Sequence, residues 1–129
     1  MEKINVAQKL SLFDAYWQPH IIGELNGQMV KVGKFKGPFT WHHHENEDEL
    51  FLVVKGRFRM DFREPATNTG KVEEKAIWIE AGELIIVPRG VEHRPYADEE
   101  THVLLFEPAS TLNTGNVRDE FTVAHLNRI

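Results

Sequence analysis

The sequence predicts an all-β protein, a β-barrel or β-sandwich, preceded by one short helix. Two observations support this prediction. Much of the chain between residues 20 and 108 alternates apolar and polar residues with a period of two, the period of a strand with one buried face. Turn-forming residues interrupt the pattern at short intervals, so that about eight short strands follow one another with almost no helix between them.

The length of 129 residues fits one domain with a single hydrophobic core. Apolar residues make up 41% of the chain and charged residues 27%, which is ordinary for a globular protein. We expect one domain with three parts: a helix and arm over residues 1–19, a barrel over residues 20–108 and a C-terminal tail over residues 109–129.

The charge balance and the lack of cysteine limit the function classes. Fifteen basic and twenty acidic residues give a net charge of −5, so we expect neither a nucleic-acid nor a membrane partner. The absence of cysteine excludes disulfides and thiolate metal ligands and fits a reducing compartment. The first thirteen residues contain no apolar run long enough for a signal peptide or membrane span. We therefore expect a cytoplasmic protein.

The N-terminal segment predicts a short helix over residues 4–13. Ile4, Ala7 and Leu10 recur at helical spacing, and Asn5 is a suitable N-cap residue. Pro19 disfavours helix in the residue before it, so an extended segment should follow.

Residues 20–35 predict a hairpin of two strands. Asn26-Gly27 lies between the strands and favours the positive φ values of a tight turn. In the second strand Val30 and Val32 share one face, and Lys31 lies on the other. Gly37-Pro38 then ends the alternation.

Further strands follow the hairpin. Residues 48–55 form an almost continuous apolar run, and residues 57–63 alternate strictly, with Phe58, Met60 and Phe62 on one face and charged residues on the other. Residues 65–71 have the composition of a loop. Three more strands are expected over residues 76–79, 83–88 and 101–108. In the tail, Phe121, Val123 and Leu126 should pack back on the domain or on a partner subunit.

A cluster of histidines and acids stands out between Gly37 and the strand of residues 48–55. We expect a strand here, in which His42 and His44 point to the same side while Trp41 and His43 point away, and Glu49 follows across a turn. Imidazole and carboxylate groups bind divalent transition metals. Because thiolates are absent, the candidate ions are Fe, Mn, Ni, Zn, Co and Cu.

Two stretches resemble the motifs of the cupin superfamily. The first motif is matched by Gly37-x4-His42-x-His44-x4-Glu49-x6-Gly56 and the second by Gly82-x5-Pro88-x-Gly90-x2-His93. The first has one residue fewer before His42 than the family pattern, and Ala97 stands where the second motif often has asparagine. Neither departure affects a ligand position.

The resemblance covers residues 37–93 and implies a small single-domain cupin, or monocupin. The implied fold is a double-stranded β-helix, a jelly-roll-like barrel. The resemblance also implies that His42, His44, Glu49 and His93 bind one divalent transition metal ion. Small cupins commonly form homodimers, and Trp17, Ile21 and Trp41 could supply an outward apolar patch for one.

Several functions agree with such a site. The first is a metalloenzyme acting on a small molecule, with oxygenase-type or sugar-isomerase-type chemistry. The alternatives are a non-enzymatic small-ligand-binding protein and a structural cupin. The residues expected at the pocket are Phe51, Phe106, Arg89 at its mouth, and His102 if its face of the strand points inward. A hydrogen-bonded core histidine is the alternative for His102.

Overall fold

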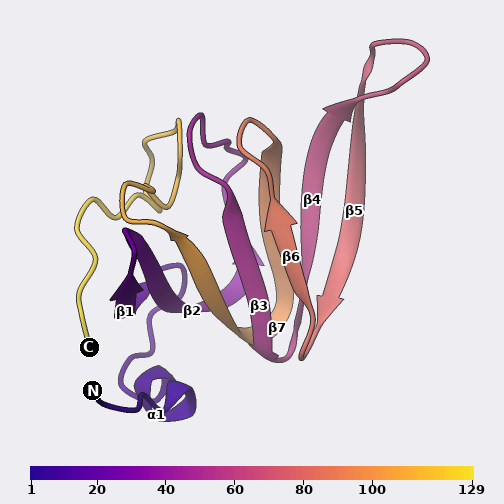
Figure 1. Cartoon of the computed structure of the whole chain (residues 1–129). Helices are drawn as coiled ribbons and strands as arrows, with labels where there is room; N and C mark the ends of the chain where they lie inside the picture. Colours follow the sequence, from indigo (N-terminus) through magenta and orange to yellow (C-terminus); the bar gives the residue numbers. More distant parts are fainter.

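The structure, a computed structural model, describes residues 1–129 and confirms the all-β prediction (Figure 1). It contains one helix and seven strands. In chain order these are α1 (Val6–Leu10), β1 (His20–Leu25), β2 (Gln28–Pro38), β3 (Glu49–Lys55), β4 (Arg57–Pro65), β5 (Val72–Glu80), β6 (Leu84–Val87) and β7 (Glu92–Pro108).

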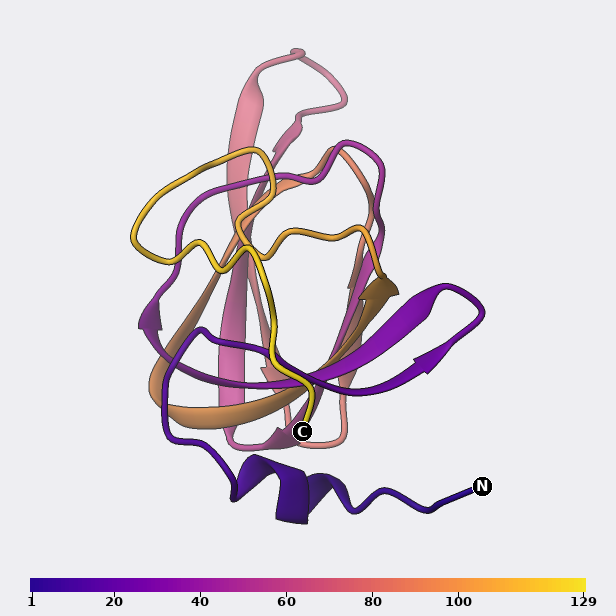
Figure 2. The same ribbon diagram turned by 90° about the vertical axis from the view of Figure 1, so that its left-hand side faces the viewer.

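Strand β7 organises the sheet, in which all pairings are antiparallel. The main path runs in the order β1-β2-β7-β3-β6, and β4 pairs with both β5 and β7. The C-terminal half of β7 lies between β2 and β3, whereas its N-terminal half pairs with β4. Figure 1 shows the β4–β5 hairpin extending beyond the other strands, and Figure 2 shows the strands curving around a common interior.

The interior is rich in aromatic side chains. Phe58 is completely buried, and its ring lies 5.4 Å from that of Phe35 and 5.9 Å from that of Phe51. Met60 is buried on the same face of β4, as the alternation predicts, but Phe62 is only half-buried. Burial of these rings supplies much of the apolar area that stabilises a domain of this size.

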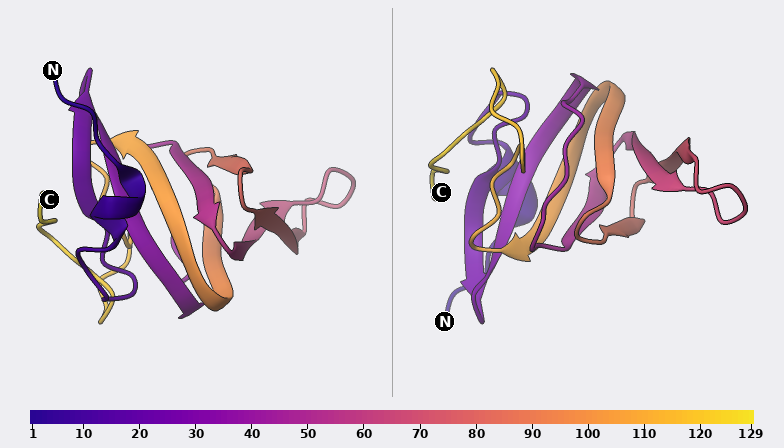
Figure 3. Two further views of the ribbon diagram at one scale, coloured as in Figure 1. Left: turned by 90° about the horizontal axis from the view of Figure 1, so that it is seen from below. Right: turned by 90° about the horizontal axis from the view of Figure 1, so that it is seen from above.

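Helix α1 covers the outer face of β2 (Figure 3). Its Leu10 packs with Ile22 and Val32, and the Asn5 side chain caps it by accepting a hydrogen bond of 2.9 Å from the backbone N–H of Gln8. The helix is shorter than the predicted segment because residues 11 and 12 form a turn. The structure contains no helix with the length and apolar character needed to cross a lipid bilayer.

The outer face of the sheet beyond α1 is apolar and partly exposed. Strand register places Leu50 between Phe106 and Ile86, and Leu52 between Leu104 and Leu84. Leu84 and Ile86 are 54% and 56% exposed. We call these six residues the outer apolar face.

The patch predicted from Trp17, Ile21 and Trp41 does not form. Trp17 and Ile21 are buried. The guanidinium carbon of Arg63 lies 3.7 Å from the centre of the Trp41 ring. The ring of Trp17 is instead part of the core, and the ring of Trp41 makes a cation–π contact.

Two further predictions need correction. Residues 41–48 are mostly irregular, with a single bridge at His42, rather than a regular strand and turn. Strand β7 begins at Glu92, well before the predicted start at residue 101, so that His93 lies in a strand. In the tail Phe121 packs against Phe39, with ring centres 5.2 Å apart, as predicted.

Candidate metal centre

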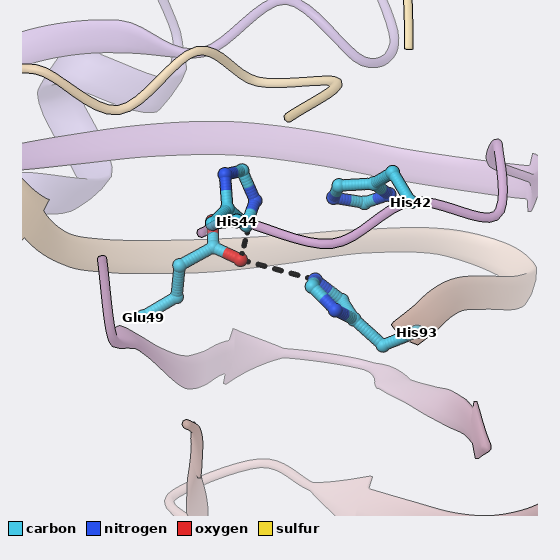
Figure 4. A group of neighbouring side chains, drawn as sticks. All are labelled: His42, His44, Glu49 and His93. Atoms are coloured by element: carbon cyan, nitrogen blue, oxygen red, sulfur yellow. Dashed lines mark hydrogen bonds and ion pairs between the residues drawn. The ribbon is translucent and has the colours of Figure 1, made fainter. Parts of the chain in front are cut away.

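The four motif residues come from three segments and meet inside the barrel. His42 and His44 lie in the connection between β2 and β3, Glu49 is the first residue of β3, and His93 is the second residue of β7. All four are buried, with at most 3% of each residue exposed. One ligand atom from each lies within 4.8 Å of those of the others, and Figure 4 shows the side chains pointing toward one another.

Backbone hydrogen bonds hold the histidine segment against the start of β7. The N–H of His42 donates to the carbonyl of His93 at 3.1 Å, and the N–H of His93 donates back at 2.8 Å. The N–H of Gly90 donates to the carbonyl of His44 at 2.7 Å. Because this segment is extended, alternate residues still point to opposite sides, and His43 lies partly exposed beside Glu45.

Two of the imidazole rings have their orientation set by the backbone. Nδ1 of His42 lies 2.8 Å from the carbonyl oxygen of Thr40, and Nδ1 of His93 lies 2.8 Å from that of Val91. A carbonyl oxygen can only accept, so each Nδ1 carries the proton. The Nε2 atom of each ring is then free to bind a metal, the arrangement typical of histidine ligands.

Glu49 and His44 complete the donor set. Oε1 of Glu49 lies 3.0 Å from Nε2 of His93 and 2.9 Å from Nε2 of His44. The second contact is close but not directed as a hydrogen bond, and both ring nitrogens of His44 are buried without a hydrogen-bond partner. A buried, unpartnered imidazole costs free energy in a protein without a ligand for it, whereas it suits a metal-binding position.

The ionisation of the cluster also favours a cation. Burial, followed by the charge of His93, lowers the pKa of His42 to about 3, so this ring is neutral at physiological pH. Burial would raise the pKa of Glu49, but the neighbouring side chains of His44, His93 and Glu107 outweigh this effect and hold the pKa well below its usual range. Burial and the charge of Glu49 raise the pKa of Glu107 well above its usual range.

The donor set therefore fits a divalent transition metal. Three imidazoles and one carboxylate could hold Fe, Mn, Ni, Zn, Co or Cu, and four protein ligands leave positions free on a six-coordinate ion.

A thin, aromatic-lined cleft reaches the cluster. Its empty space is about 440 Å³, part of it open to solvent, but only about 30 Å³ lies far enough from the walls to hold the centre of a water-sized sphere. The rings of its wall belong to Trp17, Phe35, Phe39 and Phe51. Its polar lining residues are Gln18, His42, Glu49, Glu107 and Asn113.

Of the expected pocket residues, Phe51 lines the cleft, whereas the other three lie elsewhere. Arg89 is exposed and forms an ion pair with Asp48 at 3.2 Å. His102 and Phe106 alternate with the buried Thr101, and so they point to the outer face of β7. On that face Nε2 of His102 lies 2.8 Å from a carboxylate oxygen of Glu100. His102 is therefore neither a pocket residue nor a core histidine.

The sequence interpretation missed part of the cleft. Trp17, Phe39, Asn113 and Glu107 contribute to its lining. Glu107 lies two residues from Leu105 on the inward face of β7, but the sequence does not show its direction because this strand has apolar residues on both faces. The direction of Asn113 is not predictable either, because it lies in the tail, where no periodic pattern fixes it.

The C-terminal tail rests directly on the histidine segment. The N–H of Asn116 donates to the carbonyl of His43 at 3.1 Å, and its side-chain oxygen accepts from the N–H of His43 at 2.9 Å. Gly115 has a φ of 56°, and a Cβ at this position would overlap the carbonyl oxygen of His43. The tail thus needs glycine here to approach the site.

Fold and site together define a class of protein: a small antiparallel β-barrel with a buried cluster of three histidines and one glutamate. Residues 28–107 match the family model described as a cupin domain, and the chain belongs to the cupin family. The resemblance of the two motifs to those of cupins is thereby confirmed.

Known relatives extend this assignment. The chain is 34% identical over 73 residues to the uncharacterized protein YdbB of Bacillus subtilis, covering 57% of each chain. It is 37% identical over 93 residues to the acireductone dioxygenase of Phaeosphaeria nodorum, covering 67% of this chain and 50% of that protein. The chain thus spans about half the length of these relatives.

A solved structure supports the same fold. The crystal structure of a cupin-2 domain protein from Shewanella frigidimarina is 38% identical, with a TM-score of 0.72. The match covers 81% of this chain and 93% of that one.

The lowered pKa of His42 predicts a pH dependence of stability in the metal-free protein. The unfolded chain takes up this proton below a pKa of about 6.5, whereas the folded protein does so only near pH 3. The contribution of His42 to the free energy of unfolding is therefore complete above about pH 6.5. It decreases as the pH falls toward 3, by up to about 1.4 kcal/mol per pH unit. Urea unfolding across this range, with His42→Gln for comparison, should show a shallower dependence in the variant. Equal slopes would contradict the assignment.

Proposed function

We propose that this cupin is a metal-dependent enzyme of oxygenase type that acts on a small molecule. The observation that carries the proposal is the convergence of His42, His44, Glu49 and His93, of which His42 and Glu49 line an aromatic-lined cleft. We propose these four residues as the ligands of one divalent transition metal ion.

The protein and the ion would contribute different parts of the chemistry. A bound ion with free positions supplies the activation of oxygen and the polarisation of a chelating substrate. The chain orients the imidazole rings of His42 and His93 through the carbonyl groups of Thr40 and Val91, and the aromatic walls give the cleft an apolar lining. A thin slot between rings suits a flat ligand, which could stack on them.

Oxygenase chemistry is preferred to sugar isomerisation for two reasons. An isomerase acting on a phosphorylated sugar would need basic residues at its pocket, and none of the 13 residues that line the cleft is Lys or Arg. A relative that shares 37% identity is an acireductone dioxygenase. A non-enzymatic ligand-binding cupin remains the second candidate, since it would use the same cluster and cleft.

Metal analysis tests the proposed ligands. Protein purified without chelators should contain close to one metal ion per chain, and His42→Ala and His93→Ala should each reduce metal affinity at least about tenfold because a ligand is lost. Elemental analysis after dialysis against limiting metal provides the measurement. His43→Ala is the matched control, because this ring lies outside the cluster and should leave the content unchanged. The same content in all four proteins would contradict the site.

Oxygen uptake tests the reaction class. Protein loaded with Fe(II) should consume oxygen with one or more members of a panel of vicinal diols, keto acids and catechols, and protein loaded with Zn(II) should not, because zinc has no redox chemistry. An oxygen electrode with product analysis provides the measurement. Sugar interconversion with Mn, Ni or Zn in place of oxygen uptake would support an isomerase. Ligand binding with neither reaction would support a binding protein.

We also propose that the chain forms a homodimer through the outer apolar face. An apolar surface that spans three strands and is exposed at Leu84 and Ile86 is typical of an interaction site. Ile86→Lys should convert a dimer into a monomer in light scattering at micromolar concentration. Val72→Lys is the control, because Val72 is also exposed but lies at the far end of the β4–β5 hairpin. A wild-type monomer would contradict the proposal.

A further inference from the structure

A buried ion pair lies beside the candidate metal centre and has no part in the cluster itself. Lys31 on β2 and Glu107 on β7 are 2% and 3% exposed, and Nζ of Lys31 lies 2.8 Å from Oε1 of Glu107. Lys31 points inward because its neighbours Val30 and Val32 face α1 on the other side of the strand.

A buried ion pair contributes little to the stability of a barrel interior. The free energy needed to remove both charges from water usually exceeds the free energy gained from their attraction. Apolar side chains of similar volume would stabilise the fold at least as well. Oε2 of Glu107 adds to this cost, because it is buried and has no hydrogen-bond partner of its own. The arrangement therefore points to a role other than stability.

The free oxygen belongs to a residue that lines the cleft together with His42 and Glu49. The other polar lining groups are already engaged or lie at the surface. Asn113 donates to the carbonyl of Phe121 at 2.8 Å and accepts from the N–H of Val123 at 3.0 Å. Gln18 is exposed. Glu107 is thus the buried wall residue that can still take a hydrogen bond from a ligand.

We propose that Glu107, anchored by Lys31, selects the ligand of this site by accepting a hydrogen bond from a hydroxyl or N–H group on a flat small molecule whose other end binds the metal. The inference rests on the proposed metal site and adds a specificity-determining residue to it. Lys31 occupies Oε1 and thereby fixes the carboxyl group, while Oε2 stays available to the ligand. A carboxyl oxygen can accept such a bond in either protonation state.

The test compares two probes that differ by a single donor. Pyrogallol and 3-methoxycatechol can both chelate a metal through neighbouring oxygens, but the third oxygen of 3-methoxycatechol is methylated and cannot donate. Zinc-loaded protein is titrated with each probe under anaerobic conditions by calorimetry. Wild-type protein should bind pyrogallol about tenfold more tightly, the ratio that one hydrogen bond supports.

Two variants remove the acceptor while keeping Lys31 from being buried alone. In Glu107→Gln the side-chain carbonyl still accepts the hydrogen bond from Lys31, whereas the amide nitrogen that faces the ligand is a donor. The preference for pyrogallol should therefore disappear. Lys31→Met combined with Glu107→Met removes the pair entirely and should give the same result. Glu73→Gln, at an exposed position on β5, is the control and should keep the tenfold preference.

Zinc content separates the outcomes. Zinc retained in both variants with the preference lost supports the proposal. An unchanged preference in Glu107→Gln, or the absence of any preference for pyrogallol in wild-type protein, overturns it. Loss of zinc from both variants also overturns it, because Glu107 would then act on the metal through Glu49. If wild-type protein binds no zinc or other transition metal, the proposed metal site fails, and this inference falls with it.

Discussion

The site depends on one short bridge, the two backbone hydrogen bonds between His42 and His93. These bonds join an irregular segment after β2 to the start of β7, two parts of the chain far apart in sequence. Without them the histidine segment would have no ladder to hold it, because residues 43–48 form no strand. A single bridge thus sets the distance between two of the rings, and β3 brings Glu49 to the same point.

The interior of the barrel contains several polar side chains as a consequence of this arrangement. Six ionisable residues, the four of the cluster together with Lys31 and Glu107, are buried among aromatic rings. Each polar group that lacks a partner destabilises the fold, and His44 and Glu107 both contain such atoms. Local rules of stability are commonly broken at functional sites, and three of the four buried side-chain atoms without a partner belong to these two residues, the fourth being Nδ1 of His20.

The sequence predicted the ligand cluster better than the pocket around it. His42 and His44 share a side because alternation requires only extended backbone, and so the prediction did not depend on a regular strand. For β7 alternation was ambiguous: Val103 and Leu105 face inward while Leu104 and Phe106 face outward, and all four are apolar. A strand with apolar residues on both faces gives no sign of which face is inward. Arg89 was misplaced for another reason, because its ion pair with Asp48 is a contact between distant segments.

The residues of the cleft also limit the chemistry that the protein can perform without an ion. Within the lining the ionisable groups are His42, Glu49 and Glu107, and the first two belong to the cluster. The carboxyl group of Glu107 is held in an ion pair with Lys31, so it is less available to take a proton from carbon. Isomerisation of a sugar requires such a base, whereas oxygenation of a chelating ligand relies mainly on the ion and on the shape of the slot. These side chains therefore agree with the proposed oxygenase chemistry, in which the protein would contribute recognition and orientation.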